Sequence, residues 1–263
     1  MSSDERANPL SSLILQPRSS KPRSQGVTMM IDWGVPHNQQ ADWLTVTAPY
    51  VDMAKIAVGV GALLSSETLT MKLELYRAHD ILPFLGGMFL EHAVLHDKTE
   101  DFLQAVVDAG FDCVEISDNS LDLDLDEKCE LIQLALEKYR LRVLGEVGKR
   151  EGPESKSDLA EDAARCLEAG AEFVFLEAAD FFATEVNEAA LERVVQNCGV
   201  EPLIFELPGP WIRDINPSDV HRIMRWLINR FGSDCNIADV PPDLVLTLEA
   251  LRVRLGVNVG RSS

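Results

Sequence analysis

Residues 108–116 read Asp-Ala-Gly-Phe-Asp-Cys-Val-Glu-Ile, and residues 168–176 read Glu-Ala-Gly-Ala-Glu-Phe-Val-Phe-Leu. Both stretches have the same order: the end of a helix, a glycine, an acid, and then an apolar run typical of a buried strand. Gly110 and Gly170 stand where a helix commonly ends in a left-handed residue. This self-similarity at a fixed spacing indicates that one strand–helix unit is repeated along the chain.

Short apolar runs with strand character recur through the rest of the sequence. They begin near Val27, Asp52, Leu82, Asp112, Arg142, Glu172, Pro202 and Asp234, in steps of 25 to 32 residues. Stretches with helical spacing lie between them, for example 99–109 and 158–169. Alternating strands and helices give parallel strands with right-handed crossovers. Eight even units favour a closed (β/α)8 TIM barrel over the alternative, a doubly wound open sheet.

The pattern divides the chain into residues 27–263, which we assign to a single barrel, and residues 1–26, which we expect to form a flexible tail. The tail is rich in Ser, Pro and Arg and shows no periodicity. An organelle-targeting signal is the alternative for this segment. Its early acids, Asp4 and Glu5, and its lack of a clear amphipathic helix argue against that alternative.

The amino-acid composition limits the kinds of molecule that the protein can be expected to bind. The chain has 263 residues, 46% of them apolar, and a formal net charge of −19, which disfavours binding to nucleic acid. No apolar stretch approaches the roughly 20 residues that span a bilayer. Five scattered cysteines without a CxxC pair are typical of a reducing compartment, so we expect a cytoplasmic protein. A small anionic substrate remains compatible with the charge, since a metal or a few lysines can reverse the local field. We also expect a homo-oligomer.

Active sites of TIM barrels lie at the carboxyl ends of the strands. The charged residues at or just beyond these predicted ends are Asp32, Lys55, Glu91, Glu115, Asp118, Glu146, Lys149, Glu177, Glu206 and Asp239. Clustered carboxylates repel one another unless they share protons or a cation, and oxygen ligands favour Mg²⁺ over zinc. For any single carboxylate, a helix cap or an ion pair with arginine remains an open alternative.

Two lysines stand out among these residues. Lys55 lies inside an apolar strand, where an unpaired charge is costly, and this favours a functional role. Lys149 follows a glycine in a short loop, so a solvated surface lysine remains the alternative. A buried lysine can donate a proton, hold an anion or form a Schiff base. The backbone N–H groups of Gly86 and Gly87 could also approach an anion.

Several motifs resemble those of the phosphosulfolactate synthase family. Val-Glu-Ile-Ser-Asp-Asn-Ser (114–120) resembles the family's Val-Glu-Ile-Ser-Asp-Gly-Ser, and Gly-Glu-Val-Gly-Lys (145–149) resembles its Thr-Glu-Val-Gly-Lys. Leu-Ile-Phe-Glu (203–206), Asn-Ile-Ala (236–238) and Leu-Glu-Ala-Leu-Arg (248–252) follow in family order. The resemblance runs from about Val27 to Leu255, and plant heat-stress-associated proteins share it.

This resemblance implies a TIM-barrel lyase that adds sulfite to phosphoenolpyruvate with Mg²⁺ as cofactor, forming phosphosulfolactate in sulfonate biosynthesis. It implies that Lys149 protonates C2 after sulfite attacks C3, while Lys55 helps to hold the anionic substrate. Glu146 and Glu177 are the expected metal ligands. The expected substrate-binding residues are Asp32, Gly86, Gly87, Ser117, Asp118 and Glu206.

The chain departs from the family pattern at several of these strand ends. Asp32-Trp33-Gly34 replaces the family's Asp-Lys-Gly or Asp-Arg-Gly, and residues 177–180, Glu-Ala-Ala-Asp, replace its Glu-(Ala/Gly)-Arg-Glu. Two basic residues suited to phosphate or sulfonate are therefore replaced. Related chemistry on a less charged enolisable acid remains open. The alternative function is a non-catalytic, stress-associated barrel that acts as a binding protein.

Replacing Lys149 with Met tests its role as the proton donor. The substitution keeps the length of the side chain and removes its charge, so the fold should be unchanged to within about 0.5 kcal/mol. Turnover should fall by roughly 10²–10⁴-fold, as expected when a general acid is lost. Steady-state kinetics together with thermal unfolding measure both effects. Unchanged turnover would move the acid role to Lys55.

Overall fold

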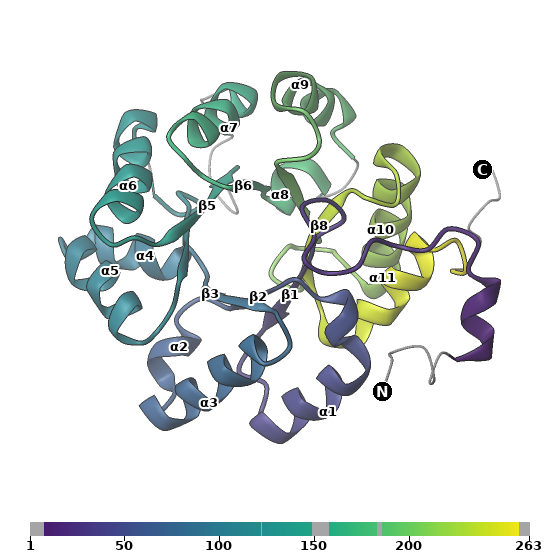
Figure 1. Cartoon of the computed structure of the whole chain (residues 1–263). Coiled ribbons are helices and arrows are strands. Elements are labelled where there is room, and N and C mark those ends of the chain that lie inside the picture. The colour runs from purple at the N-terminus through teal and green to yellow at the C-terminus, as the bar shows by residue number, and fades with distance from the viewer. Residues whose placement is uncertain (1–7, 122, 149–157, 183–185, 258–263) are drawn as a thin grey trace.

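The computed structural model describes residues 8–121, 123–148, 158–182 and 186–257. Eight parallel strands close into a barrel in which β1 pairs with both β2 and β8 (Figure 1). The predicted TIM barrel is confirmed, and each strand begins within two residues of its predicted position. The strands are β1 (Thr28–Asp32), β2 (Met53–Ile56), β3 (Leu82–Leu85), β4 (Cys113–Ile116), β5 (Arg142–Val147), β6 (Phe173–Leu176), β7 (Leu203–Glu206) and β8 (Asn236–Val240).

Helices surround the strands as an outer ring (Figure 1). Gly110 and Gly170 have φ angles of 88° and 112°, which confirms the left-handed helix ends predicted there. Not one helix in the described ranges combines the length and the apolar character that crossing a membrane requires. The α-helices are α1 (His37–Thr47), α2 (Val60–Leu63), α3 (Ser66–Arg77), α4 (Met88–Leu95), α5 (Thr99–Asp108), α6 (Leu125–Glu137), α7 (Leu159–Glu168), α8 (Ala178–Phe182), α9 (Glu188–Cys198), α10 (Pro217–Phe231) and α11 (Val245–Arg252), with 3-10 helices at Pro9–Leu13, Ala48–Tyr50 and Pro242–Leu244.

Side chains along each strand alternate between two apolar cores. On β2, Ala54 and Ile56 belong to the larger cluster, which packs the strands against the helices, while Met53 belongs to a second cluster drawn almost entirely from strand residues. The second cluster fills the barrel interior. Because successive residues of a strand face opposite sides, Lys55 shares the interior side with Met53. The same rule places Glu115 above Cys113, and so aims both charged side chains into the barrel.

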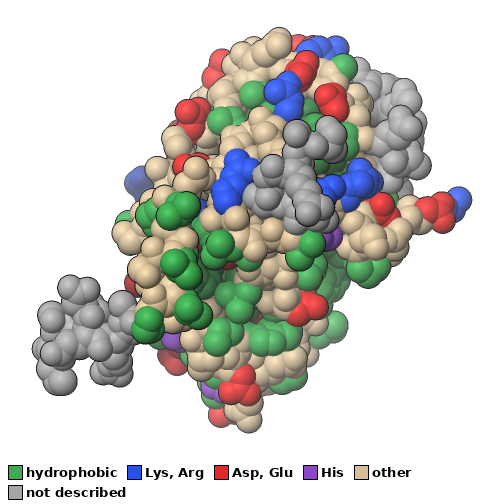
Figure 2. Space-filling model, turned by 90° about the vertical axis from the view of Figure 1, so that its right-hand side faces the viewer, with side chains coloured by type: hydrophobic (Ala, Val, Ile, Leu, Met, Phe, Trp, Pro, Cys, Tyr) green, Lys and Arg blue, Asp and Glu red, His purple; other side chains and the backbone are tan. Residues whose placement is uncertain are grey.

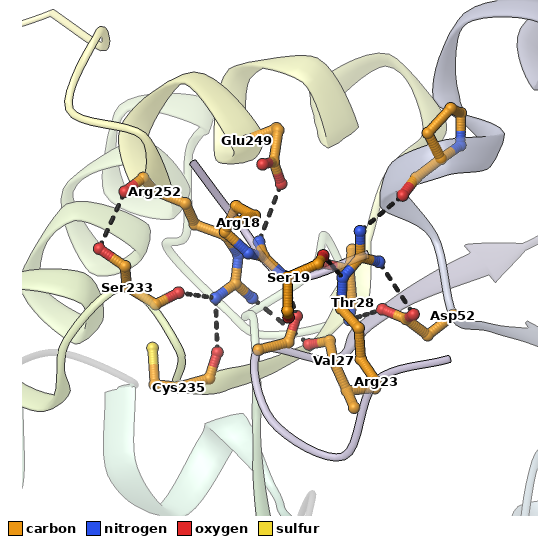
Figure 3. Close-up of polar contacts among 12 residues, drawn as sticks. Arg18, Ser19, Arg23, Val27, Thr28, Asp52, Ser233, Cys235, Glu249 and Arg252 are labelled. Atoms are coloured by element: carbon orange, nitrogen blue, oxygen red, sulfur yellow. Dashed lines mark hydrogen bonds and ion pairs between the residues drawn. The ribbon is translucent and has the colours of Figure 1, made fainter. Parts of the chain in front are cut away.

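The second half of the segment that the sequence predicts as a flexible tail contacts the barrel. Arg18 pairs with Glu249 of α11 at 2.8 Å, and Arg23 pairs with Asp52 at 3.0 Å, with only 5% and 3% of the two arginine side chains exposed. Lys21 donates to the carbonyl of His79 at 2.8 Å. These cations lie at the amino end of the barrel, where buried carboxylates and free carbonyls need donors (Figure 3).

Arg252, near the C-terminus, adds further contacts at the same amino end of the barrel. It is fully buried, and its guanidinium donates to the carbonyls of Ser233 and Cys235, both at 2.6 Å, and of Val27 at 3.3 Å (Figure 3). These carbonyls lie just before β8 and β1. The arginine of the 248–252 motif therefore has a structural role in joining the first and last strands.

Apolar side chains gather on the face that carries the N-terminal segment (Figure 2). Leu10, Leu13 and Leu15 are 67%, 64% and 88% exposed. Exposed apolar groups of this kind are typical of surfaces that contact other proteins. The homo-oligomer remains a prediction for which this face is the natural place to look.

Removing the arginines of the N-terminal segment tests whether it belongs to the folded unit. A protein carrying both Arg18→Ala and Arg23→Ala leaves Glu249 and Asp52 buried without their cations, so its free energy of unfolding should fall by about 3–5 kcal/mol. Arg77→Ala breaks an exposed pair with Asp112 and should cost no more than about 1 kcal/mol. Urea denaturation compares the two. A double variant as stable as the parent protein would restore the view of a free tail.

Candidate active site

A buried cluster of one lysine and three carboxylates occupies the carboxyl end of the barrel interior. Nζ of Lys55 lies 2.8 Å from Glu206, 3.1 Å from Glu115 and 3.3 Å from Asp239. Each of these side chains comes from a different strand, and none is more than 4% exposed. The ammonium also lies 5.0 Å from the centre of the Phe175 ring. All three N–H groups of Lys55 thus have a carboxylate nearby.

Burial and mutual repulsion change the acidity of this cluster. Burial raises the pKa of Glu115 to about 8, although Lys55 opposes the shift and Glu146 adds to it. Burial likewise raises the pKa of Glu206 well above its ordinary value, with Lys55 opposing and Asp239 adding to the shift. Burial alone would lower the pKa of Lys55, but Asp239, Glu115 and Glu206 keep it well above its ordinary value. Lys55 therefore stays protonated, and its single positive charge does not balance the negative charge of the surrounding carboxylates.

The carboxylates can hold a metal ion. Glu115, Glu146 and Glu206 each place one oxygen within 4.8 Å of the other two. Four buried oxygens in or beside this group receive no hydrogen bond from the described residues, although Oδ1 of Asp239 forms the ion pair with Lys55: Oε2 of Glu206, both carboxylate oxygens of Asp239, and Oδ1 of Asn119. Oxygen donors without nitrogen or sulfur fit a hard divalent cation such as Mg²⁺. One lysine cannot neutralise this many carboxylates, so the site fits the expected cofactor.

Backbone and side-chain donors fix the positions of the candidate ligands. The backbone N–H of Gly87 donates to Oε2 of Glu115 at 2.6 Å, and Nδ2 of Asn119 donates to Oε1 of Glu146 at 2.7 Å. Gly87 must be glycine, because a Cβ there would lie 2.4 Å from Oγ of Ser117. Gly87 therefore orients a carboxylate, and the N–H of Gly86 donates to the carbonyl of Ile56 at 3.1 Å, whereas the sequence had suggested that both N–H groups approach an anion.

The β4–α6 loop is held by two buried charged residues. Glu91 of α4 accepts hydrogen bonds from the Ser117 hydroxyl and from both the backbone N–H and the hydroxyl of Ser120. Lys128 of α6 pairs with Asp118 at 2.7 Å and donates to the backbone carbonyl of Glu146. Ser117 and Asp118, predicted to bind substrate, thus have contacts that shape the loop carrying Asn119.

Asp32 is engaged entirely within the protein. Oδ1 accepts the backbone N–H groups of Gly34 and Val35, both at 2.8 Å, and Oδ2 accepts from Lys72 at 2.6 Å and from the Tyr76 hydroxyl at 2.5 Å. Its side chain is 0% exposed. Burial raises the pKa of the Tyr76 hydroxyl, and the negative charge of Asp32 adds to this effect, so the tyrosine remains a donor. Asp32 fixes the turn after β1, although the sequence predicted that it binds substrate.

A cleft opens above the cluster at the mouth of the barrel. Lys55, Glu115, Glu146 and Asn119 form its floor. Its walls are the residues Ile31, Trp33, Ala57, Val58, Gly86, Gly87 and Met88. The described part of the chain thus combines, in one cleft, a carboxylate cluster able to hold a cation and a largely apolar surround.

Comparison with known proteins identifies the family. The sequence profile of (2R)-phospho-3-sulfolactate synthase (ComA) matches residues 16–257. This chain belongs to the phosphosulfolactate synthase family. Phosphosulfolactate synthase of Methanocaldococcus jannaschii is 30% identical over 240 residues, which are 87% of this chain and 91% of that protein. The enzyme of the same name from Methanothermobacter thermautotrophicus is 29% identical over 91% of this chain and 93% of its own length.

Two more distant proteins extend the comparison. Protein HEAT-STRESS-ASSOCIATED 32 of Arabidopsis thaliana is 24% identical, covering 90% of this chain and 89% of the plant protein. The crystal structure of 3-hexulose-6-phosphate synthase from Salmonella typhimurium aligns with a TM-score of 0.57 at 11% identity, covering 87% of this chain and 99% of that one. The last likeness shows a shared fold alone.

The structure brings together some of the site residues predicted from the family resemblance and not others. Lys55, Glu146 and Glu206 come together, and Gly86 and Gly87 line the cleft. Glu177 lies outside the three-carboxylate group: it is buried, and its Oε1 accepts the backbone N–H of Ala179 at the start of α8. Lys149 lies outside the described residues, so its role as the proton donor remains a prediction.

Four residues of the site received no specific role from the sequence: Glu115 and Asp239, which were placed only among the charged strand-end residues, and Asn119 and Lys128. The period-two alternation along Val114-Glu115-Ile116 could have revealed Glu115, because its neighbours are both apolar and face the helices. Lys128 lies at the end of the first turn of α6, and only the folded chain shows that it reaches the carboxyl end of β5.

Cation binding to the phosphosulfolactate synthase-like site should depend on pH. A divalent cation binds the ionised carboxylates, so below pH 8 its binding must release the proton that the raised pKa of Glu115 retains. Affinity for Mn²⁺ should therefore rise between pH 6 and 8, by about tenfold per pH unit for each proton released.

Isothermal titration in buffers of different ionisation enthalpy measures both the affinity and the number of protons released. Glu115→Gln should weaken Mn²⁺ binding by tenfold or more, on the order of what losing one charged ligand costs. Glu172→Gln, in an exposed pair with Arg142 at the opposite end of the barrel, is the matched control. Binding that does not change with pH would contradict the assignment.

Proposed function

We propose that this chain is a divalent-cation-dependent lyase that adds sulfite, or a related nucleophile, to phosphoenolpyruvate or a similar enolisable acid. The observation that carries the proposal is the buried cluster of Glu115, Glu146, Glu206 and Asp239 around Lys55. Membership of the phosphosulfolactate synthase family supplies the reaction class.

The chemistry needs positive charge beside the acid. When sulfite attacks C3 of phosphoenolpyruvate, a carbon–sulfur bond forms and the electron pair of the double bond moves toward C2 and the carboxylate. A bound Mg²⁺, held by Glu115, Glu146 and Glu206, would stabilise that developing negative charge. Proton transfer to C2 then completes the addition, a step for which the family resemblance points to Lys149.

The described residues would contribute to catalysis by holding the carboxylates in fixed positions. Lys55 donates to both Glu115 and Glu206 and so fixes their orientation, while Asn119 fixes Glu146. Because these side chains are buried and hydrogen-bonded, they need little reorganisation when a cation and an acid arrive, and this is the condition for strong electrostatic stabilisation. Lys55 thus acts as a positioning residue that donates hydrogen bonds to Glu115 and Glu206 and forms an ion pair with Asp239.

A non-catalytic, stress-associated barrel is the second candidate function. The similarity to Protein HEAT-STRESS-ASSOCIATED 32 of Arabidopsis thaliana is the reason to consider it. The acidic cluster argues against it. Keeping several carboxylates buried beside one lysine destabilises the fold, and a protein without a use for them would be more stable with neutral side chains there. Failure to bind any divalent cation would favour this second candidate.

Purified protein incubated with Mg²⁺, millimolar phosphoenolpyruvate and sulfite should yield phosphosulfolactate, detected by mass spectrometry. Glu206→Gln should lower turnover by roughly 10²-fold or more, because it removes a cation ligand and a partner of Lys55. Glu172→Gln serves again as the control. If cation binding is retained but no product forms, the sulfite reaction is excluded while the cation site stands.

A further inference from the structure

The cleft has two chemically different sides. Its floor carries Lys55 and carboxylates, whereas one continuous side, which we call the apolar wall, consists of Ile31, Trp33, Ala57, Val58 and Met88. Trp33 is 51% exposed, which is unusual for so large an apolar side chain in a folded protein. A ligand seated on the floor would therefore have the indole of Trp33 beside the part that points outward.

The turn that carries Trp33 is rigid. Asp32 accepts the N–H groups of the two residues that follow Trp33, and Lys72 donates both to Asp32 and to the carbonyl of Val35 at 2.7 Å. Gly34 has a φ angle of 88°, which lets the chain turn sharply after the tryptophan. The indole is thus presented by a turn fixed at its base.

A second indole supports the first. The ring of Trp211, from the loop after β7, lies 5.6 Å from that of Trp33 with a tilt of 50° between the ring planes. A Cβ on Gly209 would lie 2.1 Å from the Trp211 ring, so only glycine leaves room for it. Pro208 and Pro210 flank this glycine and restrict the loop. Two backbone segments therefore hold the aromatic pair in place.

The charges of the described cleft residues disfavour a phosphate on the apolar wall. Among the described residues that line the cleft, Lys55 is the sole cation, and its donors are directed at Glu115, Glu206 and Asp239. A phosphate dianion is bound most strongly by cationic side chains such as Arg and Lys, and Trp33, Val58 and Met88 carry no positive charge. A planar apolar group would instead stack on the indole and displace water from it.

From this arrangement we infer that the enolisable acid carries a planar apolar group, such as an aryl ring, which lies on Trp33 where a phosphate would otherwise point. The inference rests on the proposed function, because it takes the cation on the floor as the partner of the acid's carboxylate. It names the substrate class as aryl-substituted 2-oxo acids and their enols, and it makes Trp33 the residue that determines specificity.

Comparing three acids separates the contribution of an aryl ring to binding from the contribution of a phosphate. Phenylpyruvate, pyruvate and phosphoenolpyruvate are titrated into the protein with saturating Mg²⁺ and followed by calorimetry. Phenylpyruvate should bind about tenfold more tightly than either of the others, because only its ring can stack on the indole. Trp33→Lys should lower the affinity for phenylpyruvate by about tenfold and raise that for phosphoenolpyruvate by a similar factor, since a cation replaces the aromatic surface. Trp33→Phe should keep the original order.

Two controls separate specificity from damage to the fold. Trp43→Lys makes the same change in α1 at a tryptophan that does not line the cleft, and it should leave all three affinities unchanged. The Mn²⁺ affinity of the Trp33 variants should match that of the parent protein, which shows that the floor is intact. Tighter binding of phosphoenolpyruvate than of phenylpyruvate, or an order unaffected by Trp33→Lys, would overturn this inference alone. Absence of binding by all three acids would overturn it together with the proposed function.

Discussion

The ammonium group of Lys55 is the contact around which the carboxyl end of the barrel is arranged. It approaches carboxylates from β4, β7 and β8 while itself belonging to β2, so one side chain links four strands across the interior. Its single charge is smaller than the charge of the carboxylates that surround it. Desolvation makes that imbalance costly, as the raised pKa of Glu115 and Glu206 shows, and the structure is therefore poised to accept another cation.

The two ends of the barrel bury charges of opposite sign. At the amino end, Arg18 and Arg23 are buried against carboxylates, whereas Arg252 is buried against backbone carbonyls (Figure 3). Burial lowers the pKa of Arg18 to about 10, and the charge of Arg252 adds to this shift, so positive charge is concentrated at this end. At the carboxyl end, negative charge remains in excess. The first end stabilises closure of the barrel between β8 and β1, and the second provides reactivity. This division matches the usual separation of stability and catalysis in TIM barrels.

The sequence predicted the barrel well because each strand–helix unit repeats the same local signals, such as the glycines at 110 and 170 and the apolar runs after them. It predicted the site less well. Period-two alternation locates Lys55 and Glu115 on the interior side, but the partners of Asp32 come from α3, forty residues along the chain, and no local pattern reveals them. The first 26 residues lack periodicity, and the described part of this segment contacts the barrel through single arginines, Arg18 and Arg23, which no periodic pattern reveals.

The turn after β1 has an evolutionary consequence. Asp32 holds the backbone that follows position 33 through contacts to Gly34 and Val35 that do not involve the side chain at position 33. A mutation at residue 33 can therefore change the surface offered to a ligand while leaving the turn, the strand and the cation site undisturbed. Such a position can be exchanged in one step without passing through an unfolded intermediate sequence, so new preferences can arise and be selected among proteins that share the same scaffold.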